Sequence, residues 1–189
     1  MKKILFISLL SIFKIVFTYG QEKVCFQLNE SGYYETVDHK DFTVIPFNGK
    51  SSQEIYQILA SNINGIYKSP KSVMSSVENT SISIRGYSDD LIRRKLVIVG
   101  WVSCTGYYNL NFQIRDGRVR VSVPQIDNDS FKSFGDIPKT FREVVSSKFK
   151  NNTIKDKEKE YFDICVLKMN DLINSILGLT QIQKAGDDW

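Results

Sequence analysis

A β-hairpin with a defined register is encoded between Leu110 and Val123. Asp116-Gly117 separates two runs in which apolar and polar residues alternate; this is the strongest short-range hairpin signal, and it predicts a type I′ turn with positive φ at both residues. Arg115 is then expected to pair with Arg118. Six apolar residues share one face, in the pairs Ile114–Val119, Phe112–Val121 and Leu110–Val123. A slip of one residue would expose all six, so the pattern predicts a sheet with one buried and one wet face.

Residues 1–20 have the pattern of a secretory signal peptide. Lys2 and Lys3 precede an apolar run, and Gly20 is a small residue before the expected cleavage site. Lys14 interrupts a run that is already shorter than the roughly 20 residues needed to cross a bilayer. We therefore expect export to the periplasm or beyond, no membrane span after cleavage, and a single mature domain over residues 21–189.

Removal of this leader changes the charge of the chain. The full sequence has 25 basic and 21 acidic residues, a formal net charge of +4. The leader holds three lysines and no acid, so the remaining chain has 22 basic and 21 acidic residues. This balance gives no reason to expect a nucleic-acid partner.

The order of elements predicts an α+β fold. Ser51 and Glu54 form a capping box before apolar residues at helical spacing, which predicts a helix over 52–64 with Gly65 as its C-cap. Pro46 favours an edge position for the strand over 41–47. Further strands are predicted over 23–28, 33–37, 72–77, 81–87 and 94–103, with Leu96–Val102 as a central strand, and further helices over 138–150 and 157–177, the last ending at Gly178.

Three segments also resemble a known family of secreted bacterial domains of unknown function. They are KSSQEIYQIL (50–59), IVGWV (98–102) and YYNLNFQIRDGRVRVSV (107–123). The resemblance covers about residues 35–126 and implies a fold like one half of the TATA-box-binding protein (TBP-like), a curved antiparallel sheet with helices on one face. It also implies export by a Gram-negative bacterium, and residues 138–177 would supply helices that cover the sheet. It implies no DNA binding, because a shared fold does not carry function.

Cys25, Cys104 and Cys165 are the three cysteines. An exported chain could pair two of them, and Cys25 with Cys104 is the more plausible disulfide. The alternative is that they are small buried hydrophobic residues, which suits Cys165 on the apolar side of its helix.

Conventional catalytic groups are scarce. His39 is the only histidine and lies in a charged segment, and the cysteines lack the close spacing of zinc ligands. No metal, cofactor or enzymatic activity is therefore expected. A carboxylate-dependent hydrolase is the alternative, and its acids would come from Asp89, Asp90 or Asp127 in predicted turns and loops.

The wet face of the hairpin is the strongest candidate for a site. Gln113, Arg115, Arg118 and Arg120 form a basic patch, and Tyr107 at the start of the strand could add stacking. The competing interpretation is a solvated face whose charges discourage edge pairing. We expect a non-catalytic binding module with a protein or glycan partner; a structural component of the cell envelope is a further alternative.

Overall fold

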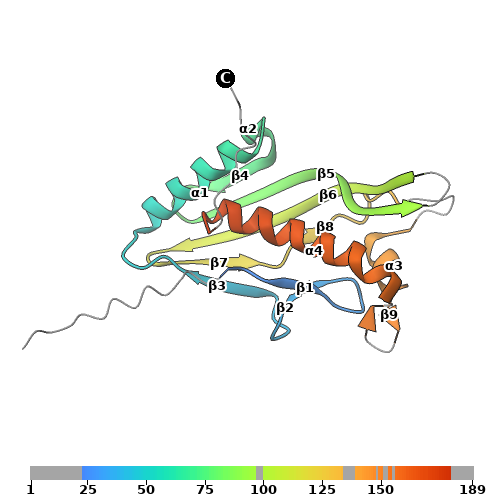
Figure 1. Cartoon of the computed structure of the whole chain (residues 1–189). Coiled ribbons are helices and arrows are strands. Elements are labelled where there is room, and N and C mark those ends of the chain that lie inside the picture. The colour runs from blue at the N-terminus through green and yellow to red at the C-terminus, as the bar shows by residue number, and fades with distance from the viewer. Residues whose placement is uncertain are drawn as a thin grey trace, which may run out of the picture.

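The computed structural model describes residues 23–96, 100–133, 139–147, 149–150, 153–154 and 156–179. Its main sheet is antiparallel, with strand order β3-β7-β6-β5-β4 and with β8 pairing with β6. Helices α1 and α4 contact each other and lie over one face of this sheet (Figure 1). The α+β fold is therefore confirmed. The main sheet consists of β3 (Phe42–Pro46), β4 (Met74–Val77), β5 (Ser81–Leu96), β6 (Gly100–Arg115), β7 (Arg118–Ser122) and β8 (Gln125–Ile126). The helices over it are α1 (Ser52–Ile66) and α4 (Asp156–Ile176).

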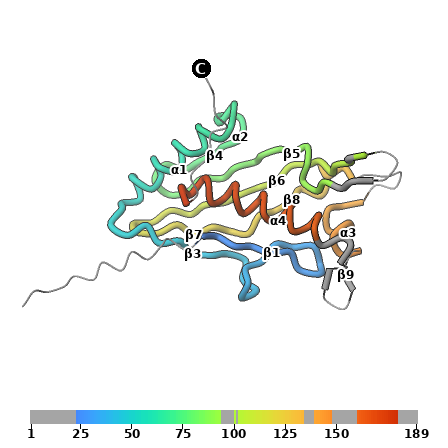
Figure 2. Tube along the Cα trace, viewed as in Figure 1, coloured from blue at the N-terminus to red at the C-terminus, as the bar shows by residue number. Residues whose placement is uncertain are grey.

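Two long strands form the centre of the sheet. β5 and β6 are each 16 residues long and pair with each other, and they extend beyond the shorter strands (Figures 1 and 2). The register shifts between Ser88 and Ile92, so β5 continues through a bulge beyond the predicted strand 81–87 and ends in the first three residues of the predicted strand 94–103. Leu96 pairs with Gly100. The prediction of one central strand over 96–102 is wrong, because its two ends belong to different strands.

The hairpin between β6 and β7 has the predicted register near its turn. Arg115 pairs with Arg118, Ile114 with Val119 and Phe112 with Val121. The Leu110–Val123 pair does not form: β7 ends at Ser122 and the N–H of Val123 donates to the carbonyl of Asp41. From there Asn109 pairs with Gln125, one residue out of the earlier register.

The turn itself differs from the predicted type I′. Gly117 has φ +74°, whereas Asp116 is not among the described residues with positive φ. Asp116 instead reaches α1, where its Oδ1 accepts the backbone N–H of Ser52 over 2.6 Å. The N–H of Gly117 donates to the carbonyl of Lys50, and the N–H of Phe47 donates to the carbonyl of Gly117. The hairpin tip therefore fastens the β3–α1 connection to the sheet.

The two long helices bury an apolar layer against the sheet. The capping box of α1 is present: Ser51 Oγ accepts from the N–H of Glu54, and Glu54 accepts from the N–H of Ser51. Helix α1 continues to Ile66 and is capped at Tyr67, so the Gly65 cap is wrong. Helix α4 has the predicted length and stops at Gly178, whose φ is +72°. Its apolar stripe joins Ile55, Leu59 and Ile63 of α1 in one core with the inner residues of the sheet.

A small N-terminal sheet is held against α4 by two buried asparagines. β1 (Phe26–Leu28) and β2 (Tyr34–Thr36) pair antiparallel, as the two predicted strands require. Asn174 accepts from the N–H of Val24 over 2.8 Å and donates to its carbonyl over 2.9 Å. Asn170 makes the same two bonds with Phe26. The two asparagine side chains thus bond the backbone N–H and C=O groups of Val24 and Phe26, as a neighbouring strand would.

The short elements depart most from the predictions. A helical turn, α2 (Pro70–Val73), precedes β4 where a strand was predicted from residue 72. Helix α3 (Phe141–Ser146) is shorter than the predicted 138–150, since Phe149 and Lys150 form β9 and pair with β10 (Thr153–Ile154). Helix α3 begins at a capping box between Thr140 and Glu143, a local signal the prediction overlooked. The predicted signal peptide and Pro138 lie outside the described residues.

The predicted Cys25–Cys104 disulfide is not formed. All three cysteines are free thiols; Cys25 is exposed, and Cys104 and Cys165 are buried. Cys25 is in the strand segment held by Asn170 and Asn174, whereas Cys104 pairs with Ile92 in the main sheet. Cys165 lies in the core beside the hydroxyl of Tyr34, as a small buried residue of the helix stripe.

Candidate functional site: the outer face of the sheet

The face of the main sheet opposite α1 and α4, here called the outer face, carries mostly polar side chains. Strand alternation puts Phe112, Ile114, Val119 and Val121 into the core and their neighbours outward. The cross-strand pairs define the outer rows. They contain Ser75 on β4, Ser81, Ser83, Arg85 and Tyr87 on β5, Tyr107, Asn109, Asn111, Gln113 and Arg115 on β6, Arg118 and Arg120 on β7, and Val44 on β3.

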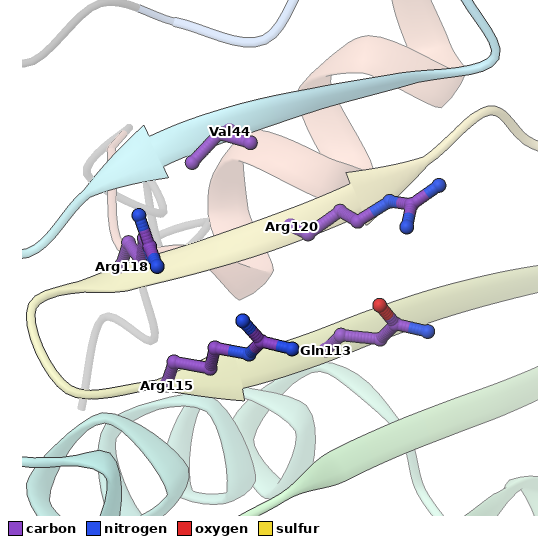
Figure 3. A pocket seen from close by; sticks show the side chains of 5 residues that line it. All are labelled: Val44, Gln113, Arg115, Arg118 and Arg120. Carbon is purple, nitrogen blue, oxygen red and sulfur yellow. The ribbon is translucent and has the colours of Figure 1, made fainter.

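Four of the five predicted site residues line one cavity. Gln113, Arg115, Arg118 and Arg120 surround an open hollow of about 190 Å³, here called the arginine cavity. Val44, 46% exposed, is its fifth lining residue and contributes an apolar wall from β3. Figure 3 shows these side chains on three neighbouring strands, with the helices behind the sheet. The register explains the grouping, because Arg120 pairs with both Gln113 and Val44 and Arg118 pairs with Arg115.

The three arginines of this cavity have no acidic partner within the described part of the chain. The described ion pairs use other residues, and Asp116, the nearest acid in sequence, is bonded to Ser52. Arg120 packs its guanidinium 3.9 Å from the centre of the Phe42 ring, and its buried Nε has no hydrogen-bond partner. Three cations without a counter-charge on one small surface produce a positive potential that an anionic ligand would neutralise.

Tyr107 lies elsewhere on the outer face. It is 40% exposed and pairs with Tyr87, which is 55% exposed; the two rings meet edge to face with centroids 5.2 Å apart. The Arg85 guanidinium lies 4.8 Å from the centre of the Tyr107 ring and is ion-paired with Asp127 over 2.7 Å. The neighbouring Tyr108 is buried, and its hydroxyl is bonded to that of Tyr67. Tyr107 is therefore a surface residue with an aromatic partner, outside the arginine cavity.

A second hollow lies between Tyr107 and the arginine cavity. It has a volume of about 270 Å³ and is here called the amide hollow. Its polar lining consists of Ser72, Ser75, Ser83, Arg85, Asn109 and Asn111. Ser83 donates to the Asn111 side chain over 2.8 Å, and no described residue bonds the side chain of Asn109. Since Arg85 is neutralised by Asp127, this hollow offers hydroxyl and amide groups without an unpaired charge.

Two of the acids proposed for hydrolysis, Asp90 and Asp127, are engaged in separate ion pairs, and Asp89 is exposed. Asp90 lies in the β5 bulge rather than in a turn, and its carboxylate is paired with Lys168 of α4. Asp127 is paired with Arg85, and it also lines a cavity of about 320 Å³ whose other described lining residues include no acid. His39 is bonded to Glu35 on the N-terminal sheet. Among the described residues no three His, Cys, Asp or Glu side chains are grouped as metal ligands.

Several residues of the outer face were missed by the sequence interpretation. Val44, Ser83, Arg85 and Tyr87 are brought to the site by the pairing of β3 with β7 and of β5 with β6. Asn111 was already placed on the wet face by the hairpin pattern, and Asn109 alternates with it, so the same pattern contained a signal for Asn109. The β5 run Ser81–Tyr87 alternates as well, but its partner strand could not be identified from local pattern alone.

Comparison with known proteins supports the fold. The chain is similar in structure to a TBP-like protein from Parabacteroides distasonis, with a TM-score of 0.50 and 13% identity over 73% of this chain and 89% of that chain. It is also similar to a DUF4468 family protein from Bacteroides ovatus, with a TM-score of 0.54 and 11% identity over 86% of this chain and 91% of that chain. No family model and no curated protein matches the sequence.

These neighbours confirm the predicted TBP-like fold. At such low identity they show fold alone, so they assign no site residue. No helix within the described residues is both long and apolar enough to cross a bilayer.

Proposed function

We propose that this protein is an exported, non-catalytic binding module that holds an acidic group in the arginine cavity of its outer face. The observation that carries the proposal is the convergence of three arginines without acidic partners on one hollow. Without the expected leader, the chain has 22 basic and 21 acidic residues, so its overall charge does not account for three unpaired arginines at one place. Its open sheet face also has no covering element among the described residues of the chain.

The chemistry of the cavity favours a carboxylate or a similar planar or tetrahedral anion. Arginine presents a fork of N–H donors that binds such groups through two hydrogen bonds at once. Gln113 adds an amide that can donate or accept. The volume of about 190 Å³ is below the roughly 300–1,000 Å³ of sites that enclose a whole small molecule. The cavity therefore suits one acidic group of a longer ligand.

The test uses hexaglutamate as a minimal acidic probe. Arg115→Gln/Arg118→Gln removes two exposed cations that make no described contact needed for folding. We expect at least a tenfold loss of affinity by calorimetry, together with chemical-shift changes at Gln113 in the unaltered chain. Affinity should fall as salt is added. The matched control is Lys23→Gln/Lys68→Gln, which removes two exposed charges that line neither hollow.

Equal weakening by both double variants would contradict a defined site, since it would show only a general charge effect. Absence of binding that depends on Arg115 and Arg118 at low salt, for hexaglutamate and for acidic sugars alike, would contradict the proposal directly. Unfolding midpoints within one or two degrees of the unaltered chain would show that both variants retain the fold.

A further inference from the structure

The outer face combines two adjoining hollows of different chemistry. Gln113 lines the arginine cavity and Asn111 lines the amide hollow, two positions apart on the same side of β6. Same-side neighbours on a strand are about 7 Å apart. The arginine cavity spans β6, β7 and β3, whereas the amide hollow spans β4, β5 and β6. A ligand that occupied both would run across the strands over roughly two inter-strand spacings, about 10 Å.

The amide hollow is suited to hydroxyl groups. Serine hydroxyls and asparagine amides each both donate and accept hydrogen bonds, as sugar hydroxyls do. Asn109 has no described side-chain partner, and Asn111 uses only its oxygen, toward Ser83. Both amide groups therefore retain free N–H donors at the surface. The exposed Tyr87–Tyr107 pair continues the same face beyond Arg85 and Asn109 and offers apolar ring surface.

A peptide fits this face less well than a sugar chain. The backbone N–H and C=O groups of a sheet lie in its plane and are bonded to neighbouring strands, so they are not available to a ligand resting on the face. An extended peptide there would lose the backbone pairing that gives strand addition its affinity at a sheet edge. A sugar chain needs side-chain amides, hydroxyls and rings, and these are what the outer face presents.

We infer that the ligand of the outer face is an acidic oligosaccharide, with a carboxylate or sulfate group in the arginine cavity and an adjoining neutral ring in the amide hollow. This inference rests on the proposed function, because the arginine cavity anchors the ligand. It adds the class of ligand and assigns Asn109 and Asn111 as binding residues. An acidic peptide is the competing ligand, and the experiment below separates the two.

The experiment compares four probes at equal ionic strength: an unsulfated chondroitin hexasaccharide, in which carboxylate-bearing rings alternate with neutral rings; its neutral methyl ester; a κ-carrageenan hexasaccharide, in which sulfated rings alternate with neutral rings and no carboxylate is present; and hexaglutamate. The two acidic sugars distinguish a carboxylate from a sulfate anchor. We expect at least one of them to bind ten times more tightly than hexaglutamate and the ester to bind at least ten times more weakly than the free acid if the anchor is a carboxylate.

Variants then separate the two hollows. Asn109→Ala/Asn111→Ala should weaken the preferred acidic sugar about tenfold and leave hexaglutamate unchanged. Arg115→Gln/Arg118→Gln should weaken both. Asn64→Ala, an exposed asparagine of α1, is the matched control and should change neither. Unfolding midpoints are measured for each variant, and Asn109→Ser/Asn111→Ser replaces the alanine variant if that one fails to fold.

Two results would overturn the inference while the proposed function stands: hexaglutamate binding as tightly as the preferred acidic sugar, or unchanged affinity for that sugar in the Asn109/Asn111 variant. A failure of the proposed function looks different. In that case no acidic probe shows binding that depends on Arg115 and Arg118, and the inference fails with it.

Discussion

Asn170 and Asn174 are the buried polar side chains of α4 among the described residues, and each makes two bonds to the same backbone residue of the N-terminal segment. Their partners Val24 and Phe26 are buried as well, so water cannot replace a lost bond. Burying a polar group without a partner costs about 1–3 kcal/mol. These asparagines therefore determine whether the N-terminal sheet remains attached to the core.

We predict that Asn174→Ala lowers the free energy of unfolding by about 2–3 kcal/mol, because it orphans both the N–H and the carbonyl of Val24. Urea denaturation measures this change, and hydrogen exchange should show faster exchange of the Val24 amide. Asn64→Ala is the control: its side chain is exposed on α1, and alanine favours a helix. Equal effects of the two substitutions would show that the buried bonds contribute little.

At the scale of elements, the β6–β7 hairpin and α1 stabilise each other through Asp116. Its carboxylate accepts the N–H of Ser52 at the first turn of α1, where the helix dipole favours a negative charge. The residues on either side of this turn, Arg115 and Arg118, line the arginine cavity. The contact thus ties one end of the candidate site to the helix layer.

We predict that Asp116→Ala destabilises the protein by about 1–2 kcal/mol, whereas Asp116→Asn, which keeps an acceptor oxygen, costs about 0.3–1 kcal/mol. Thermal unfolding at low and high salt checks this, because salt screens only the charge-dependent part. Asp163→Ala on the exposed side of α4 is the matched loss of one acid. Equal stability of the alanine and asparagine variants would show that the bond from the Ser52 N–H to Asp116 does not stabilise the first turn of α1.

Elements encoded by local pattern were predictable, and those that depend on distant partners were not. The hairpin register near Asp116-Gly117, the α1 capping box and the α4 stripe each lie within one segment. The β5 bulge involves Asp90 and its partner Lys168 on α4, 78 residues away. Val44 reaches the arginine cavity only because β3 pairs with β7, and nothing near Asn174 indicates its bond to Val24, 150 residues away.

At the scale of the whole molecule, the core buries titratable groups that are neutral at physiological pH. Burial raises the pKa of the Cys165 thiol from 9.0 to about 11, an effect that outweighs the lowering by its hydrogen bond with Tyr34. Burial likewise raises the pKa of the hydroxyls of Tyr34, Tyr67 and Tyr108 above 10.0. These groups lie in or against the core between the sheet and the helices, so their ionisation would lower the free energy of unfolding.

We predict that these groups leave the stability unchanged below about pH 8 and that the stability falls progressively above it. Between pH 9 and 11 the Cys165 thiol loses its proton in the unfolded chain but keeps it in the folded one, so the folded state binds more protons and the free energy of unfolding decreases with pH. A rise of two pKa units corresponds to a loss of up to about 3 kcal/mol. Urea denaturation at pH 8, 9 and 10 measures this decline. The tyrosines of the unfolded chain also begin to ionise near pH 10, so the thiol is isolated by the difference between the unaltered chain and a Cys165 variant. Cys165→Ala should flatten the decline, whereas Cys25→Ala, which removes an exposed thiol, should leave it unchanged. An equally steep decline in the Cys165→Ala variant would mean that other groups cause the alkaline loss of stability.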